Sequence, residues 1–261
     1  ITSQYYLRAR FYNPVIGRFL NEDTYYGDGL NLYTYCHNNP VEYVDPSGNW
    51  CKKKFKQKVK EYLEKGYSKK DAKVMANYEQ IRENYDVNSA EQYLRAVLDY
   101  ENLSPEAWKS IDQFRESHGL NTLGNGLPKK GDGTVAFINA NGEKIFGINS
   151  SLLSEDKKML GKKYYESMKE AGYFDNVTSY GNGSGQVFTH AEGNSLMNVY
   201  DLYGKSIGKD ITIFCDRTTC GICKNNLGYF KDYFGIDSLT VLNKNGDIVI
   251  INKGTYIKIK S

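Results

Sequence analysis

The sequence predicts an α/β fold with a mixed sheet in its C-terminal half, because strand and helix patterns alternate there. The stretch "DITIFC" (residues 210–215) alternates like a strand, "CGICKNNLGYFKDYF" (220–234) has the period of a helix, and "SLTVLN" (238–243) is again a strand. Strand, helix and strand over this length predict a right-handed crossover and parallel pairing. Two Asn-Gly pairs, at 141–142 and 245–246, predict tight hairpins and hence antiparallel neighbours.

The remaining elements of this half follow from local patterns. The stretch "TVAFINANGEKIFGI" (134–148) is typical of two strands around the first Asn-Gly turn, and "DIVIIN" (247–252) forms the closing hairpin with the strand before it. Ser154 begins a helix that is expected to run to about Gly172. A glycine-rich loop, "YGNGSGQ" (180–186), leads into a helix that begins near His190.

The middle of the chain has helical periodicity. In "KKKFKQKVKEYLEK" one helix face carries the apolar residues Phe55, Val59, Tyr62 and Leu63. The lysines of the opposite face are expected to be solvated. Ser89 and Gln92 form a capping-box pattern, and Ser104-Pro105 predicts the start of a further helix. The stretch "GLNTLGNGLPKKGDG" (119–133) has no periodicity and predicts a linker.

Composition indicates a globular protein. Of the 261 residues, 40% are hydrophobic and 25% are charged, and the net charge of +3 permits an anionic partner without requiring one. No apolar run approaches the roughly 18 residues of a membrane span, and no signal peptide opens the sequence. Five cysteines are too few and too scattered for a disulfide scaffold, which favours a reducing compartment. Because the sequence begins at Ile1, we expect it to be part of a longer protein.

The first 49 residues are rich in aromatic residues, Asn, Gly and Asp, and predict short strands and turns. The stretches "YYLRARFYNPVIGRFLNED" (5–23) and "GLNLYTYCHNNPVEYVDPSG" (29–48) closely resemble the C-terminal end of the core in Rhs and wall-associated YD-repeat proteins. This resemblance implies a β-strand shell that encapsulates a variable toxin domain, which follows the "DPxG" element directly.

The same resemblance implies a site of self-cleavage in the shell. In that family a pair of aspartates cuts the chain after the second "DPxG" element. Asp45 matches in "VDPSG", whereas Asp23 is followed by Thr24 instead of proline, and Asn49 replaces leucine after the element. Cleavage near Asn49 is therefore left open, since Asp45-Pro46 also fits an ordinary turn.

A cluster of potential metal ligands is the main functional signal. Cys220 and Cys223 lie three residues apart at a helix start, so their sulfur atoms can bind one ion. His190 is a third ligand from the preceding helix, and Glu192 lies in the first turn of that helix. Three protein ligands would leave zinc one open position, as in catalytic sites. The alternatives are a closed structural site with Cys215 as the fourth ligand, a redox pair, and coincidence.

The pattern H-x-E followed by C-x-x-C on successive helices is that of the zinc-dependent nucleobase deaminases. "HAEGNS" (190–195) and "TCGIC" (219–223) most resemble cytosine deaminase toxins that act on double-stranded DNA, apart from Thr219 where proline is usual. The resemblance implies a cytidine-deaminase-like three-layer fold with zinc on His190, Cys220 and Cys223, and Glu192 as the proton carrier. It also implies substrate contact by Asn149, which could equally be a turn residue.

Together these observations predict three parts: a shell end (1–49), a helical segment (50–130) and a zinc-dependent deaminase toxin domain (131–261). We expect a secreted effector that deaminates cytosine in nucleic acid, most readily DNA, single- or double-stranded, in the cytoplasm of a competing bacterium. Its expected partners are a cognate immunity protein and the rest of the Rhs shell. The alternatives are a non-catalytic zinc-stabilised delivery or adhesion module, and a deaminase of free nucleosides, nucleotides or RNA.

Overall fold

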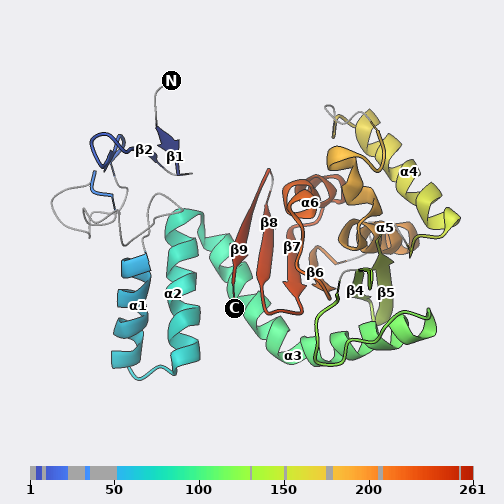
Figure 1. Cartoon of the computed structure of the whole chain (residues 1–261), viewed down its shortest axis with the longest axis horizontal. Helices are drawn as coiled ribbons and strands as arrows, with labels where there is room; N and C mark the ends of the chain where they lie inside the picture. Colours follow the sequence, from blue (N-terminus) through green and yellow to red (C-terminus); the bar gives the residue numbers. More distant parts are fainter. Residues whose placement is uncertain are drawn as a thin grey trace. The chain divides into compact units, whose positions relative to one another are not determined.

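The computed structural model describes residues 4–7, 10–22, 33–35, 52–129, 131–149, 152–174, 179–204, 208–252 and 254–260 (Figure 1). Within these ranges no helix has both the length and the apolar character that a membrane span requires.

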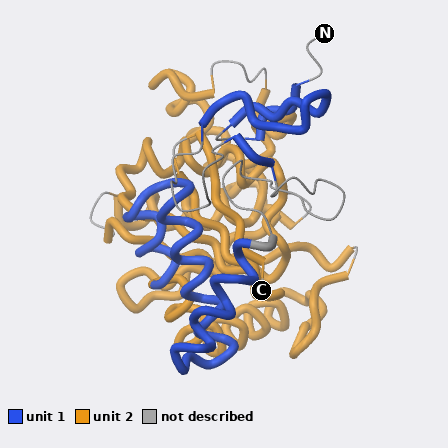
Figure 2. The backbone as a smooth tube through the Cα atoms, turned by 90° about the vertical axis from the view of Figure 1, so that its left-hand side faces the viewer, with its two compact units in different colours: residues 1–94 blue, residues 95–261 orange. Residues whose placement is uncertain are grey.

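The chain forms two compact units, residues 1–94 and 95–261 (Figure 2). Helix α3 (Val87–Ser117) extends across the boundary between them. The predicted division into 1–49, 50–130 and 131–261 stays a prediction, and its second boundary falls inside the second unit.

The first unit begins with a small antiparallel sheet. Its strands are β1 (Tyr5–Tyr6), β2 (Phe11–Asn13) and β3 (Arg18–Phe19), in that order. The buried ring of Phe19 packs under the guanidinium of Arg10, which lies 3.6 Å from the ring centroid. This sheet confirms the short strands and turns that the aromatic N-terminal stretch predicts.

A pair of helices completes the first unit, α1 (Lys52–Glu64) and α2 (Lys69–Asn84). The apolar face predicted for α1 is only partly correct, because Leu63 is 43% exposed while the lysine Lys54 is buried. The ammonium of Lys54 lies 3.2 Å from the carboxylate of Glu83 in α2, and this pairing compensates the burial of its charge.

The second unit is built on a six-stranded sheet with the order β5-β4-β6-β7-β8-β9. Its strands are β4 (Val135–Ala140), β5 (Glu143–Ile148), β6 (Asp210–Cys215), β7 (Ser238–Asn243), β8 (Ile248–Asn252) and β9 (Thr255–Ile259). The β6–β7 pair is parallel and all other pairs are antiparallel, so the predicted mixed sheet and crossover are confirmed. Strand β9 lies outside the elements predicted from sequence.

Helices cover both faces of this sheet and give three layers (Figure 1). On one face α5 (Ala191–Tyr203) and α6 (Gly221–Phe234) pack on the inward side chains of β6 and β7, with α4 (Glu155–Glu170) beside them. The other face receives α3, where the Trp108 ring lies 5.6 Å from that of Phe214. The α/β three-layer fold class predicted from sequence is therefore confirmed.

The first predicted hairpin has the geometry that its sequence requires. Asn141 and Gly142 both have positive φ, 53° and 86°, between the paired residues Ala140 and Glu143. Two consecutive residues with positive φ are typical of a type I′ turn, whose twist matches that of the flanking strands.

Helix α3 differs from the prediction at two points. It begins before Ser89, whose backbone N–H donates to the side chain of Asp86 at 2.6 Å, so the capping carboxylate lies three residues earlier than expected. Pro105 lies inside the helix and does not begin a new one. Tertiary packing outweighs the missing N–H of the proline, because Ala107 and Ile111 just beyond it are buried within the second unit.

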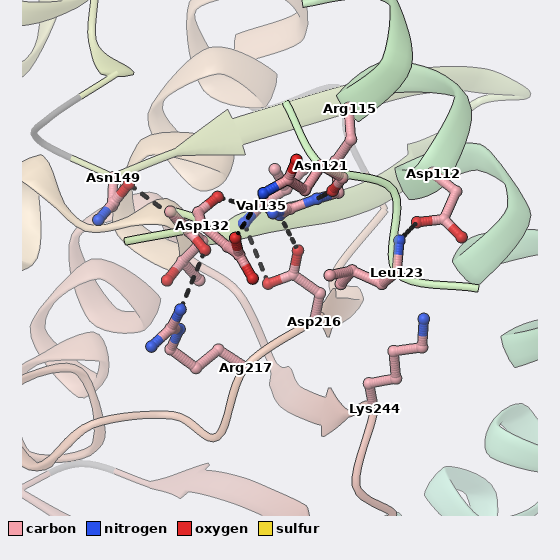
Figure 3. Close-up of polar contacts among 12 residues, drawn as sticks. Asp112, Arg115, Asn121, Leu123, Asp132, Val135, Asn149, Asp216, Arg217 and Lys244 are labelled. Carbon is pink, nitrogen blue, oxygen red and sulfur yellow. Dashed lines mark hydrogen bonds and ion pairs between the residues drawn. The ribbon is translucent and has the colours of Figure 1, made fainter. Parts of the chain in front are cut away.

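The predicted linker after α3 has no helix or strand, but hydrogen bonds tie it to the second unit. The carboxylate of Asp112 accepts from the backbone N–H groups of Leu123 and Gly124 at 2.8 and 2.7 Å (Figure 3). On the sheet side, the ammonium of Lys244 donates to the carbonyl of Gly124. This segment is therefore an integral loop of the second unit and not a flexible connection.

A fully buried ion pair joins this loop to the sheet. The Nη1 atom of Arg115 lies 2.7 Å from Asp216, and both side chains are 0% exposed (Figure 3). The same guanidinium donates to the carbonyls of Asn121 and Asp132, each at 2.6 Å. Asp216 also accepts from the backbone N–H of Val135 at 3.1 Å. The ion pair and its hydrogen bonds thus link α3, the loop, β4 and the segment after β6.

We predict that Arg115→Met lowers the free energy of unfolding by about 3–5 kcal/mol, because it leaves the Asp216 carboxylate buried without its partner. Denaturant unfolding of the full chain measures this loss. The matched control is Lys144→Met, which removes an exposed pair with Glu106 and should cost less than about 1 kcal/mol. Equal losses in the two variants would contradict a special role for the buried pair.

Candidate metal centre and its cavity

The starts of two neighbouring helices place the candidate metal ligands. His190 is the N-cap residue of α5, and Cys220 is the N-cap residue of α6. The backbone N–H of Cys223, in the first turn of α6, donates to the sulfur of Cys220 at 3.5 Å. The helix start thus orients one cysteine and places the second beside it.

The three side chains fit a single metal ion. The Nδ1 atom of His190 lies 3.3 Å from the sulfur atoms of both Cys220 and Cys223, and all three ligand atoms lie within 4.8 Å of one another. A tetrahedral zinc ion with Zn–S of about 2.3 Å and Zn–N of about 2.0 Å sets its ligand atoms roughly 3.5–3.8 Å apart. The donor set and its spacing therefore suit such an ion after small adjustments.

The cluster also favours the ionised form of one cysteine. Hydrogen bonds from Cys223 and then His190 lower the pKa of the Cys220 thiol to about 4. The pKa of Cys223 is raised, mainly by its hydrogen bond to Cys220 and by burial. A thiolate is the form that binds metals, so Cys220 is prepared for ligation at neutral pH.

Glu192 lies beside the three ligands. Its side chain is almost wholly buried, and its Oε2 atom is 3.4 Å from the sulfur of Cys223. On an ideal helix a residue two positions after His190 would point away, but the first turn of α5 brings it back toward the cluster. Burial raises the pKa of Glu192 above its ordinary value, because it disfavours the charged carboxylate.

A cavity of about 340 Å³ opens onto this cluster. His190, Glu192 and Cys220 line it together with Asn149, while Gly133 and Arg217 contribute from the loop before β4 and the segment after β6. Its volume lies within the range of about 300–1,000 Å³ that is usual for ligand pockets.

Asn149 follows β5 directly and has a double role in the geometry. Its side-chain oxygen accepts from the backbone N–H of Thr134 at 3.3 Å, and its own N–H donates to the Thr134 carbonyl at 3.2 Å (Figure 3). The residue thus closes the end of the β4–β5 pair and also lines the cavity. Both interpretations of Asn149, turn residue and cavity residue, fit its position.

Two glycines allow the close approach that positions the start of α5. A Cβ atom on Gly193 would lie 2.0 Å from the carbonyl oxygen of Val187, in the 3₁₀ helix η4 (Gly183–Thr189). On Gly147 of β5 it would lie 2.1 Å from the carbonyl oxygen of Ala191. The glycine in "HAEGNS" therefore lets the backbone of α5 pack directly on its neighbours.

Thr219 explains how a residue other than proline fits before the first cysteine. Its backbone N–H and its hydroxyl group both donate to the side-chain oxygen of Asn243, at 2.8 and 2.9 Å. Proline has neither donor, so here the threonine fixes the segment by hydrogen bonds instead of by its ring.

Cys215 does not join the metal ligands. It is 0% exposed and packs in the apolar core between the sheet and the helices. In the described part of the chain, the group of side chains that could hold a metal comprises His190, Cys220 and Cys223. This geometry gives no support to the closed four-ligand alternative.

Three residues around the cavity were not predicted from sequence: Arg115, Asp216 and Arg217. For Asp216 and Arg217, the sequence signal is the pair of adjacent charges between a strand and the cysteine pair, and no local pattern indicates Arg115. The predicted processing residues Asp23 and Asp45 lie outside the described residues, as do His37, Cys36 and Cys51.

We predict that Gly193→Ala destabilises the chain by about 1–3 kcal/mol or more, since the methyl group meets backbone atoms that cannot move independently. Gly221→Ala, in the first turn of α6, is the matched control, because nothing lies within 4 Å of its added Cβ. Helix propensity should leave the control unchanged or stabilise it by up to about 1 kcal/mol. Denaturant unfolding distinguishes the two, and an unperturbed Gly193→Ala variant would refute the close approach.

Comparison with known proteins gives matches to short stretches of much longer chains. The chain is 52% identical over 54 residues to the tRNA(Glu)-specific nuclease WapA of Bacillus subtilis subsp. natto. It is 50% identical over 54 residues to the tRNA nuclease WapA of Bacillus subtilis strain 168 and to the tRNA3(Ser)-specific nuclease WapA of Bacillus spizizenii. Each match covers 19% of this chain, which spans about 2% of the length of these relatives.

No solved structure matches the chain significantly. A family model does: the model of the MafB19-like deaminases matches residues 112–260. The matched region includes Arg115 and Asp216 as well as the histidine, glutamate and cysteine cluster. The match covers more than half of the chain, which therefore belongs to the MafB19-like deaminase family.

Proposed function

We propose that this protein is a zinc-dependent deaminase that converts cytosine to uracil in nucleic acid. The position of Glu192 carries the proposal. Its carboxyl group is nearly buried, lies beside the His-Cys-Cys cluster and lines the cavity. In this position it has a use in transferring protons between a water molecule and a substrate. A metal site that only stabilises the fold would leave it without one, so its position favours catalysis over the delivery or adhesion alternative.

His190, Cys220 and Cys223 would hold the zinc ion. When bound by three protein ligands, zinc supplies a water molecule that is ionised near neutral pH. The reaction adds water at C4 of the pyrimidine and releases the exocyclic amino group as ammonia.

Glu192 would carry the protons that this reaction moves. Its carboxylate would take one proton from the attacking water and deliver it to the ring nitrogen N3. It would then take the remaining proton from the oxygen now bonded to C4 and deliver it to the amino group, so that ammonia leaves and the C4 carbonyl forms. The raised pKa of Glu192 favours this role, because it makes the carboxylate a stronger proton acceptor than an exposed glutamate. Asn149, on the wall of the same cavity, is placed to contact the base or its sugar.

The proposed setting is that of a toxin. The resemblance of residues 5–23 and 29–48 to the end of an Rhs-type core supports an effector that is secreted and acts in the cytoplasm of a recipient bacterium. In this setting the producing cell requires an immunity protein that covers the cavity. The relatives named as tRNA nucleases support nucleic acid as the substrate class, with DNA proposed first and RNA as the competing substrate.

We predict that Glu192→Gln lowers the rate of uracil formation by about two to four orders of magnitude and leaves zinc content and unfolding behaviour nearly unchanged. The measurements are cleavage by uracil glycosylase of an oligonucleotide with one cytosine, and metal analysis of the purified chain. A Glu192→Gln protein with the full rate would overturn the mechanism.

We further predict that Cys223→Ser loses zinc and stability together, since metal binding and folding are linked. Cys215→Ala is the control, because this buried residue lies outside the ligand cluster, and it should keep one zinc ion per chain. If Cys215→Ala loses zinc as readily as Cys223→Ser, the site is a closed structural one.

A further inference from the structure

We propose that Arg217 binds a phosphate group of the substrate, so that the cavity takes cytosine in a nucleotide or polynucleotide in preference to the free nucleoside. This inference rests on the proposed function for the identity of the base. The phosphate contact itself rests on the geometry of Arg217 and can be tested separately.

The chain places two adjacent charges on opposite sides of one segment. Asp216 is turned inward to the buried Arg115, whereas Arg217 lines the cavity that also contains His190 and Glu192. Figure 3 shows the Arg217 side chain reaching from this segment toward the loop that carries Asp132. A cationic group therefore lies on the wall of the candidate active site.

The contacts of Arg217 leave part of its guanidinium without a hydrogen-bond partner. Its Nη2 atom donates to the backbone carbonyls of Lys129 and Gly133, at 2.8 and 3.3 Å. Its Nε atom is buried and has no hydrogen-bond partner in the described part of the chain. Within that part, no carboxylate forms an ion pair with it, although its charge interacts with the more distant carboxylates of Asp132 and Asp216. Arg217 therefore lacks the close carboxylate partner that Arg115 has in Asp216.

These features suit an anionic oxygen ligand with several acceptors. A guanidinium presents its N–H groups in a planar fork that matches phosphate, and such charge-assisted bonds are among the stronger hydrogen bonds in proteins. The two carbonyl contacts hold the side chain in place, so little conformational freedom remains to be lost on binding.

The loop whose carbonyls accept from Arg217 leaves room for such a ligand at one position. Gly131 and Gly133 line the cavity and have φ of 99° and 73°, a conformation that side chains disfavour. A Cβ atom added at Gly131 would meet nothing within 4 Å, whereas one added at Gly133 would lie 2.6 Å from the side chain of Leu152. The phosphate would thus lie beside Gly131 and Arg217, with the base toward Glu192.

The first test compares substrates with and without phosphate. For the wild type and Arg217→Met, kcat and KM are measured on deoxycytidine, on dCMP and on an oligonucleotide with one cytosine. We expect the variant to raise KM for one or both phosphate-bearing substrates about 10- to 100-fold relative to deoxycytidine, with kcat little changed. A loss on dCMP identifies a terminal phosphate as the ligand, and a loss on the oligonucleotide alone identifies a backbone phosphodiester.

A control variant separates phosphate binding from loop support. Asn121→Ala removes a hydrogen bond to Asp132 in the same loop without changing the charge of the cavity. It should affect all three substrates in the same proportion. If Arg217→Met also affects them in equal proportion, Arg217 only supports the loop and the inference is wrong.

The second test does not depend on turnover. Oligonucleotide binding is measured against salt concentration in a Glu192→Gln background, with and without Arg217→Met. Loss of one phosphate contact should reduce the slope of log K against log salt by about 0.7 for a single strand. An unchanged slope overturns the phosphate contact. A reduced slope, together with a chain with Glu192 intact that deaminates none of the substrates of the first test, would support the contact and reject the proposed function.

Discussion

The buried pair of Arg115 and Asp216 is the interaction on which the second unit depends. A carboxylate and a guanidinium that are both fully buried are stable only together, and here two loop carbonyls and one strand N–H give the pair three further hydrogen bonds. The pair fixes the loop before β4 and the segment after β6, and these form one wall of the cavity. Apolar packing alone would leave that wall without a defined position.

The part of the cavity wall that carries the candidate metal ligands is positioned by the N-termini of α5 and α6. His190 and Cys220 are both N-cap residues, and their helices pack on the same face of the sheet. The glycines at 147 and 193 bring α5 close enough that the first turn carries Glu192 into the cluster. The candidate site therefore lies where two helix N-termini meet the sheet, and the loop before β4 contributes to the wall of its cavity.

The sequence predicts the helices and strands of this unit well, but it does not predict the long-range side-chain interactions that hold them together. Asn141-Gly142 and the strand-helix-strand pattern reveal the hairpin and the parallel pair, because turn geometry and periodicity are local properties. His190, Cys220 and Cys223 are recognisable because metal ligands require particular residue types at particular spacings. Arg115 lies 101 positions before Asp216, and no local pattern marks two distant charges as partners. The loop at 119–133 resembles a linker because the hydrogen bonds that hold it come from residues outside its own sequence. Pro105 resembles a helix start because the packing that keeps α3 continuous through it is also not visible in the local sequence.

X-ray absorption at the zinc edge of the purified full chain tests whether His190, Cys220 and Cys223 hold zinc with one position open for chemistry. We expect one zinc ion with two sulfur neighbours at about 2.3 Å and two nitrogen or oxygen neighbours at about 2.0–2.1 Å. A third sulfur neighbour, or a chain that binds no zinc at all, would contradict it.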